Sequence, residues 1–213
     1  MIEQTSIIQK IAISIIPLLF AITLHEAAHA WVANKRGDKT AYSLGRVSLN
    51  PLVHIDPVGT IIMPILLLTL GSPFLFGWAK PVPVNWRNLK NPRNDKIWVA
   101  LAGPLANLVM AFLWAGVIKL THSFAPPVAA NTETFSILQF ILLTSIFGLQ
   151  INILLMILNL LPIPPLDGSR VIASLLPPKM AFQYEKIEPF GLFILVALLA
   201  TGLLSRIMGP SFK

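Results

Sequence analysis

Cysteine is absent from the 213-residue sequence, which excludes disulfide bonds and metal sites built from thiolates. Charged residues are scarce as well: they make up 12% of the chain, about half the share found in a typical soluble domain. Hydrophobic residues account for 55%, and the mean hydropathy is +0.74. This composition predicts a membrane protein whose core is buried in the lipid bilayer as much as within the protein itself.

Acidic residues are the rarer charged type, with 9 Asp and Glu against 16 Lys and Arg, so the net charge is +7. In a soluble domain such an excess would suggest a nucleic-acid partner. In a chain this apolar, basic loops that hold membrane spans in orientation are the better explanation. We therefore expect a lipid bilayer, and no nucleic acid, around this protein.

Long apolar stretches divide the chain. A helix needs about 20 residues to cross ~30 Å of hydrocarbon, and four stretches are long enough: 7–33, 97–119, 135–161 and 188–206. A fifth stretch, 58–76, is short and is interrupted by Pro64. The pattern predicts an all-α polytopic membrane protein with four to five transmembrane helices, forming a single membrane-embedded domain over residues 1–213.

The basic loops indicate the path of the fifth stretch. Lys and Arg cluster after the first span, after 58–76 and after the 135–161 span, and the positive-inside rule places such loops in the cytoplasm. All three can lie inside only if 58–76 enters and leaves the membrane on the same side, as a re-entrant element. Its flanks, SLGRVSLNP and GWAKPVPVN, alternate and contain proline, which favours short edge strands. The polar loop 120–134 is expected outside.

One span carries unusual polar residues in the stretch LHEAAHA. His25 and His29 are four residues apart, so they share one face of a helix. Two imidazoles in that arrangement can bind one zinc ion, and Glu26 beside them can take a proton from a zinc-bound water. The same pattern arises by chance on ordinary surface helices. Inside a span, however, a charged side chain costs about 2.5–3.5 kcal/mol, so such residues normally face a cavity and have a function.

A catalytic zinc site usually has three protein ligands, and the sequence offers His54, His122 and Asp167 as candidates for the third. Asp167 lies just past the 135–161 span, on the predicted cytoplasmic side. His25 and His29 lie toward the cytoplasmic end of their own span, so these three residues fall at similar depth. Taken alone, Asp167 has the simpler explanation of a turn residue before a glycine.

Together the two stretches LHEAAHA and NLLPIPPLDGSR resemble the site-2 protease family of intramembrane zinc metalloproteases, in a compact form without a PDZ domain. The stretches GWAKPVPVN and AGPLANLVMA also resemble segments of that family. The resemblance implies one Zn²⁺ per chain, bound by His25, His29 and Asp167, with Glu26 as general base and acid. The asparagine at the head of the second motif is Asn159, whose amide could donate to the developing oxyanion. Its alternative role is that of a helix-end residue near Pro162.

The resemblance implies an intramembrane zinc endopeptidase that cuts transmembrane segments of membrane proteins by means of a zinc-activated water. We expect an integral protein of a bacterial or archaeal cell membrane, with its active site toward the cytoplasmic side. The alternative is a divalent-metal transporter or another metal-binding membrane protein. A transporter should show polar groups along a path through several helices, whereas here they cluster at one depth.

Other polar positions have simpler interpretations. Gly103 and Asn107 in AGPLAN place small residues on one helix face, which favours close helix packing, although Asn107 could also touch the substrate backbone. His54 and Asp56 could support a metal site, but a role in capping the entry to the re-entrant element is the better interpretation.

Single cysteines introduced at Lys39, Lys90 and Ala125 test the predicted topology, because the chain has no cysteine of its own. We expect a membrane-impermeant thiol reagent added outside the cell to label position 125 and to leave positions 39 and 90 unlabelled. Labelling at position 90 without labelling at position 39 would show that 58–76 is a true span.

Overall fold

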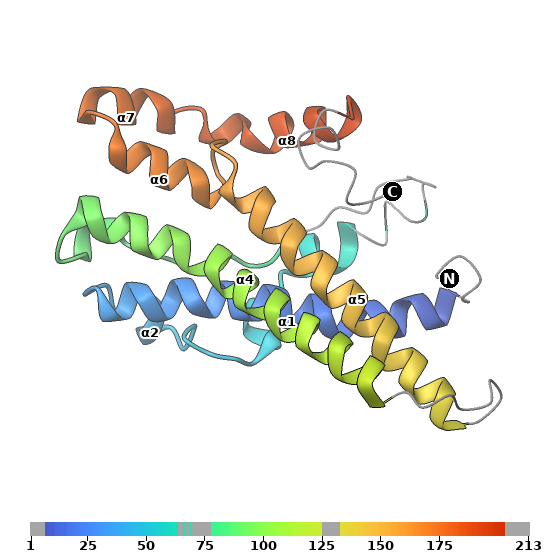
Figure 1. Cartoon of the computed structure of the whole chain (residues 1–213). Coiled ribbons are helices and arrows are strands. Elements are labelled where there is room, and N and C mark those ends of the chain that lie inside the picture. The colour runs from blue at the N-terminus through green and yellow to red at the C-terminus, as the bar shows by residue number, and fades with distance from the viewer. Residues whose placement is uncertain (1–6, 64–65, 67–68, 70–77, 125–132, 203–213) are drawn as a thin grey trace.

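Three long helices form the body of the protein. The computed structural model describes residues 7–63, 66, 69, 78–124 and 133–202. Within this part of the chain, the helices long and apolar enough to cross a membrane are α1 (Ile7–Lys35), α4 (Pro92–Phe124) and α5 (Glu133–Leu160). They cross as a bundle in which α4 packs against both α1 and α5 (Figure 1). The predicted all-α membrane fold is therefore confirmed.

Of the fourth predicted span, 188–206, the structure describes only the ten-residue helix α8 (Gly191–Ala200) and its immediate neighbours. Residues 203–206 lie outside the described part, so the expected count of four to five spans is not reached by the described helices. The shorter elements are α2 (Thr40–Ser43), η2 (Pro51–His54), η3 (Pro57–Ile62), η4 (Trp86–Asn88), α6 (Asp167–Leu175), α7 (Pro178–Glu185) and η5 (Glu188–Phe190).

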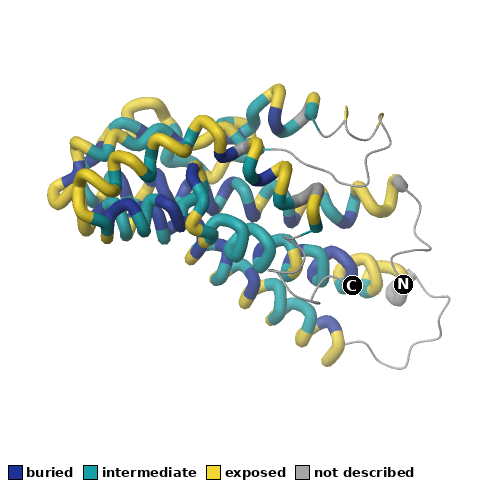
Figure 2. The backbone as a smooth tube through the Cα atoms, turned by 90° about the horizontal axis from the view of Figure 1, so that it is seen from above, coloured by how far each residue is buried: buried dark blue, intermediate teal, exposed yellow. Residues whose placement is uncertain are grey.

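Small side chains allow the spans to approach one another. Ala21, Ala30 and Ala33 on α1 are fully buried, and small residues at helix contacts let backbones come close in a membrane. Large apolar side chains such as Ile8, Phe112 and Ile137 are instead exposed, and Figure 2 shows exposed positions recurring along the helices. Such side chains suit contact with lipid.

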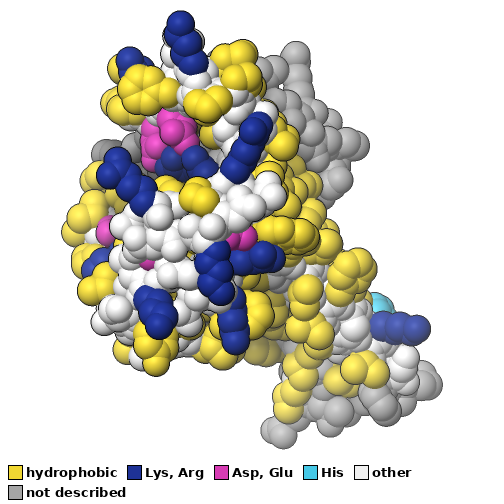
Figure 3. Space-filling model, turned by 90° about the vertical axis from the view of Figure 1, so that its left-hand side faces the viewer, with side chains coloured by type: hydrophobic (Ala, Val, Ile, Leu, Met, Phe, Trp, Pro, Cys, Tyr) yellow, Lys and Arg dark blue, Asp and Glu magenta, His cyan; other side chains and the backbone are white. Residues whose placement is uncertain are grey.

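One end of the bundle is strongly basic. Lys and Arg side chains gather on the face that lies at the left of Figure 1, where α2 and the α6–α7 turn are found (Figure 3). This gathering agrees with the sequence-based expectation that the basic loops share one side of the membrane.

The predicted edge strands are wrong: neither flank of 58–76 forms a strand in its described residues. Pro81 and Pro83 have no N–H group, so this segment has few donors for a strand ladder. Three other N–H groups donate elsewhere: Lys80 to the His54 carbonyl (2.9 Å), Val82 to the Glu26 carboxylate (2.8 Å) and Asn85 to the Asp38 carboxylate (2.8 Å). Residues 78–85 are therefore held by individual side chains and turns instead of by a sheet.

Residues at the two ends of the 58–76 stretch lie close together. The Trp78 N–H donates to the Gly59 carbonyl at 3.1 Å, and the Thr60 hydroxyl donates to the Trp78 carbonyl at 2.9 Å. A membrane-crossing helix would separate its ends by ~30 Å. The contact supports entry and exit on one side, although most of residues 64–77 lie outside the described part of the chain.

Asp38 attaches the end of α1 to the segment before α4. Its buried carboxylate accepts hydrogen bonds from the Thr40 N–H (3.1 Å), the Thr40 hydroxyl (2.5 Å), the Asn85 N–H (2.8 Å) and the Asn88 amide (3.0 Å). Burial by itself raises the pKa of this carboxyl, but the donors together lower the pKa below its ordinary value. The charged form is therefore the one that the fold stabilises.

Asp38→Ala should lower the free energy of unfolding by about 2–3 kcal/mol, because hydrogen bonds to a charged group contribute about that much. Since the folded-state pKa is depressed, the stabilisation is present above the unfolded pKa of about 3.9 and is lost as the pH falls through the folded value. Denaturant unfolding in detergent micelles at neutral and acid pH measures both effects. The exposed Ser43→Ala, whose hydroxyl bonds only within its own turn, is the control. A loss of stability no larger than that of Ser43→Ala would contradict the assignment.

Candidate metal centre

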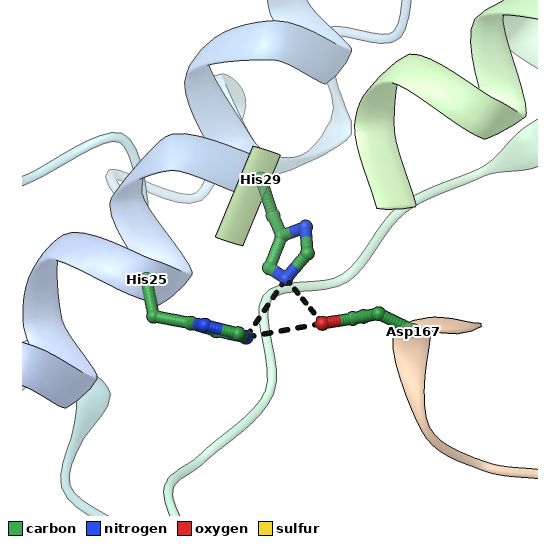
Figure 4. A group of neighbouring side chains, drawn as sticks. All are labelled: His25, His29 and Asp167. Carbon is green, nitrogen blue, oxygen red and sulfur yellow. Dashed lines mark hydrogen bonds and ion pairs between the residues drawn. The ribbon is translucent and has the colours of Figure 1, made fainter. Parts of the chain in front are cut away.

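His25, His29 and Asp167 converge on one point between α1 and the start of α6. The Nε2 atoms of the two histidines lie 3.0 Å apart, and the Asp167 Oδ2 atom lies 3.2 Å from each of them. Figure 4 shows the three side chains pointing toward one another. Both imidazoles are buried and Asp167 is largely so. In the described part of the chain, this is the one group of His, Asp and Glu side chains arranged to hold a metal ion.

The proline-rich loop brings Asp167 to this point. α5 ends at Leu160, and prolines at positions 162, 164 and 165 prevent the helix from continuing. α6 then begins with Asp167 itself. The following residue, Gly168, is buried so closely against the Leu160 and Leu161 carbonyls that a Cβ atom would collide with them. The tight return of the chain therefore requires glycine after the aspartate.

The Nδ1 atom of each imidazole, which is the nitrogen turned away from Asp167, has a fixed partner on α4. His29 Nδ1 lies 2.7 Å from the Val99 carbonyl oxygen, and His25 Nδ1 lies 2.6 Å from the Asn107 Oδ1 atom. A carbonyl oxygen can only accept a hydrogen bond, so each neutral ring carries its proton on Nδ1. The Nε2 lone pairs then face Asp167, which is the arrangement that ring nitrogens need for binding a metal.

This donor set fits Zn²⁺. Three electron-pair donors about 3 Å apart repel one another unless a cation lies between them. The Asp167 Oδ2 atom is buried and accepts no ordinary hydrogen bond. Two imidazoles and one carboxylate form a donor set found in catalytic zinc sites, which leave the fourth position to water or substrate.

Glu26 lies beside the metal-binding group but is not part of it. Its Oε2 atom accepts a hydrogen bond from the Val82 N–H at 2.8 Å. Val82 stands between two prolines, so its N–H is the one backbone donor in residues 81–83. The contact fixes one oxygen of the carboxylate. Sequence reasoning had not anticipated this contact.

The remaining candidates are not among the three converging side chains, and Asn159, His54 and Asp56 make hydrogen bonds to other groups. The Asn159 amide donates to the Leu155 carbonyl of its own helix at 3.0 Å, as a helix-end residue would. His54 Nε2 donates to the Ser48 carbonyl at 2.9 Å. Asp56 caps η3 by accepting from the Val58 and Gly59 N–H groups, as expected of a capping residue. His122 is exposed near the end of α4.

Residues on α4 form one wall of the site. Gly103 contacts the metal-binding side chains themselves, because a Cβ atom there would overlap the His25 and His29 rings. Asn107, one turn further along the helix, is fully buried and contacts His25. Close packing at Gly103 agrees with the expectation, but the atoms packed against it belong to two imidazole rings and not to a helix backbone. The sequence did carry a signal for the role of Asn107: its polar amide lies in an apolar helix, one turn after Gly103 and so on the same face.

Comparison with known proteins identifies relatives of this chain. The model of a family described as Peptidase family M50 matches residues 13–149. YwhC of Bacillus subtilis, assigned by name as a zinc metalloprotease, is 41% identical over 196 residues, which cover 92% of this chain and 84% of YwhC. Rip2 of Mycolicibacterium smegmatis, assigned likewise, is 33% identical over 88% of this chain and 66% of its own length. MJ0611 of Methanocaldococcus jannaschii, with the same assignment, is 34% identical over 75% of this chain and 69% of its own length. No solved structure matches the chain.

Asp167→Ala should abolish tight metal binding, because it removes the anionic member of the group. We expect zinc affinity to fall by more than ~100-fold, the upper end of the effect of losing an outer hydrogen-bond partner of a ligand. Metal content of the purified protein and competition with a chelator measure this change.

Asp56→Ala and His54→Ala are the matched controls, since both residues lie outside the converging group. Undiminished zinc binding by Asp167→Ala, together with loss of binding in His54→Ala, would show that the third ligand is misassigned.

Proposed function

The chain belongs to peptidase family M50, whose relatives establish it as a zinc metalloprotease, and on that premise we propose that it is an intramembrane endopeptidase that cuts transmembrane segments of other membrane proteins. The observation that carries the proposal is the convergence of His25, His29 and Asp167 at a buried point beside Glu26, within helices that can cross a membrane. The gathering of basic side chains at one end of the bundle supports placing the active site toward the cytoplasm of a bacterial or archaeal cell.

In this proposal His25, His29 and Asp167 hold Zn²⁺, which when bound supplies Lewis acidity that lowers the pKa of water toward 7 and polarises a peptide carbonyl. Glu26 takes the proton from the attacking water and then delivers it to the leaving amine. The Val82 N–H fixes one oxygen of Glu26, so the other oxygen carries the proton. The Asn159 amide donates to the developing oxyanion once it leaves the Leu155 carbonyl.

The substrate must change shape before it can be cut. A transmembrane helix satisfies its peptide groups within itself, because the hydrocarbon offers no other partner. A peptide carbonyl can reach the metal and Glu26 only after the helix unwinds locally. Cleavage therefore requires a segment that unwinds easily, and the proposed partners are membrane proteins with such a segment.

Glu26→Gln tests the proposed mechanism directly. The glutamine keeps the shape and an oxygen that can accept from Val82, but it cannot act as a base. We expect zinc content to be unchanged and the rate of cleavage to fall at least ~10²–10⁴-fold, the usual contribution of general acid–base catalysis. The measurements are metal analysis and cleavage of a single-pass membrane substrate in proteoliposomes, where uncut substrate should remain bound.

Glu188→Gln is the matched control, because this carboxylate pairs with Arg170 and is not part of the converging group. A metal transporter predicts a different result, namely altered zinc flux in Glu26→Gln and no proteolysis in the wild-type protein. Cleavage at the wild-type rate in Glu26→Gln would end the assignment of Glu26 as the base.

A further inference from the structure

A chain of buried amide groups connects α5 to the metal-binding group on α1. The Asn152 amide nitrogen donates to the Gly148 carbonyl at 2.8 Å. The Asn107 amide nitrogen donates to the Asn152 Oδ1 atom at 2.9 Å and to the Ala21 carbonyl at 3.2 Å. The Asn107 Oδ1 atom then faces His25 Nδ1 at 2.6 Å. Both asparagines are fully buried.

The orientation of both amides is determined by the backbone. The Gly148 carbonyl can only accept, so Asn152 must present its nitrogen there and its oxygen toward Asn107. The Ala21 carbonyl and the Asn152 oxygen are likewise acceptors, so Asn107 must direct its nitrogen toward them. A reversed Asn107 would set its oxygen against two other oxygens in a water-poor interior, at a cost of several kcal/mol.

This fixed direction has a consequence for His25. Because Asn107 has only its oxygen left for His25, the imidazole must carry its proton on Nδ1, and the Nε2 lone pair is left free for a metal. A reversed Asn107 would present an N–H group to Nδ1 and favour the opposite tautomer, in which Nε2 is protonated and cannot bind a metal. The orientation of the Asn152 amide on α5 thus determines the tautomer of His25 on α1.

We propose that Asn152 and Asn107 are positioning residues that hold His25 in its metal-binding tautomer, so that Asn152 controls zinc affinity without contacting the metal or its ligands. The proposal rests on the proposed function in one respect, that His25 binds zinc. It also explains why two amides occur inside apolar spans, where each needs a full set of partners. A merely structural role, joining three helices by hydrogen bonds, would stabilise the fold and leave the tautomer and the zinc affinity unaffected.

The two roles predict different results for three substitutions. Asn152→Ala and Asn152→Leu remove the acceptor that orients Asn107, the first without adding volume and the second with a side chain of similar size. Asn152→Asp, buried in its protonated form, can still donate to Gly148 and accept from Asn107. Ser145→Ala is the matched control, because Ser145 is fully buried on the same helix and its hydroxyl bonds only to the Ile141 carbonyl of α5.

We expect Asn152→Ala and Asn152→Leu to weaken zinc binding by about 10–100-fold, the usual effect of losing an outer partner of a ligand. Asn152→Asp should restore affinity to near the wild-type value, and Ser145→Ala should leave it unchanged. Chelator competition on the purified proteins measures the affinities. In the metal-free proteins, ¹⁵N chemical shifts of labelled histidine should show His25 protonated at Nδ1 in the wild type and a mixture of tautomers in Asn152→Ala.

Zinc affinity and His25 tautomer in Asn152→Ala equal to those in Ser145→Ala would overturn the proposal. So would a loss of affinity in Asn152→Asp as large as that in Asn152→Ala. Failure of the wild-type protein to bind zinc through Asp167 would instead overturn the proposed function. The tautomer measurement is made without metal, so it decides the role of Asn152 in either case.

Discussion

The structure depends on bringing three electron-pair donors to one buried point where water is scarce. His25, His29 and Asp167 repel one another at distances of 3.0–3.2 Å unless a cation joins them. Holding them there requires support from outside α1, and α4 supplies it through the Val99 carbonyl and Asn107. The break in the chain after α5 brings in Asp167, the proposed third ligand. The packing order of the spans follows from this requirement, because α4 contacts α1, α5 and α6.

The same scarcity of water governs the backbone around the site. The segment 78–85 has no strand partner among the described residues, yet the N–H groups of Trp78, Lys80, Val82 and Asn85 all donate hydrogen bonds. Two carboxylates accept hydrogen bonds from this segment: Glu26 accepts from the Val82 N–H, and Asp38 accepts from the Asn85 N–H. One of these carboxylates is also the proposed base. The position of the base and the path of this segment are therefore coupled, and a substrate that approaches Glu26 approaches residues 80–84 at the same time.

Sequence reasoning named the three side chains that the structure brings together, but not the contacts that support them. The four-residue spacing of His25 and His29 fixes a shared helix face, and Asp167 followed from matching depth and from the family motif. The contacts of Asn107 and Asn152 depend on how α1, α4 and α5 rotate against one another, which no local pattern encodes. The strand prediction failed because alternating polar and apolar residues and prolines predict an extended backbone, but they do not determine which groups its N–H donors will bond. Here the partners are two carboxylates, of Glu26 and Asp38, and two backbone carbonyls, of His54 and Gly59, instead of a neighbouring strand.

Gly103 shows how closely helix packing and metal binding are joined. Small residues in spans are usually explained by backbone approach, and the sequence favoured that explanation. The atoms that fill the space above Gly103 are instead those of the His25 and His29 rings, which leave no room for a Cβ atom. One turn along the same face, Asn107 orients one of those rings. The separation of α1 and α4 is therefore set by the size of two imidazoles, and a change in that separation would alter the metal-binding geometry directly.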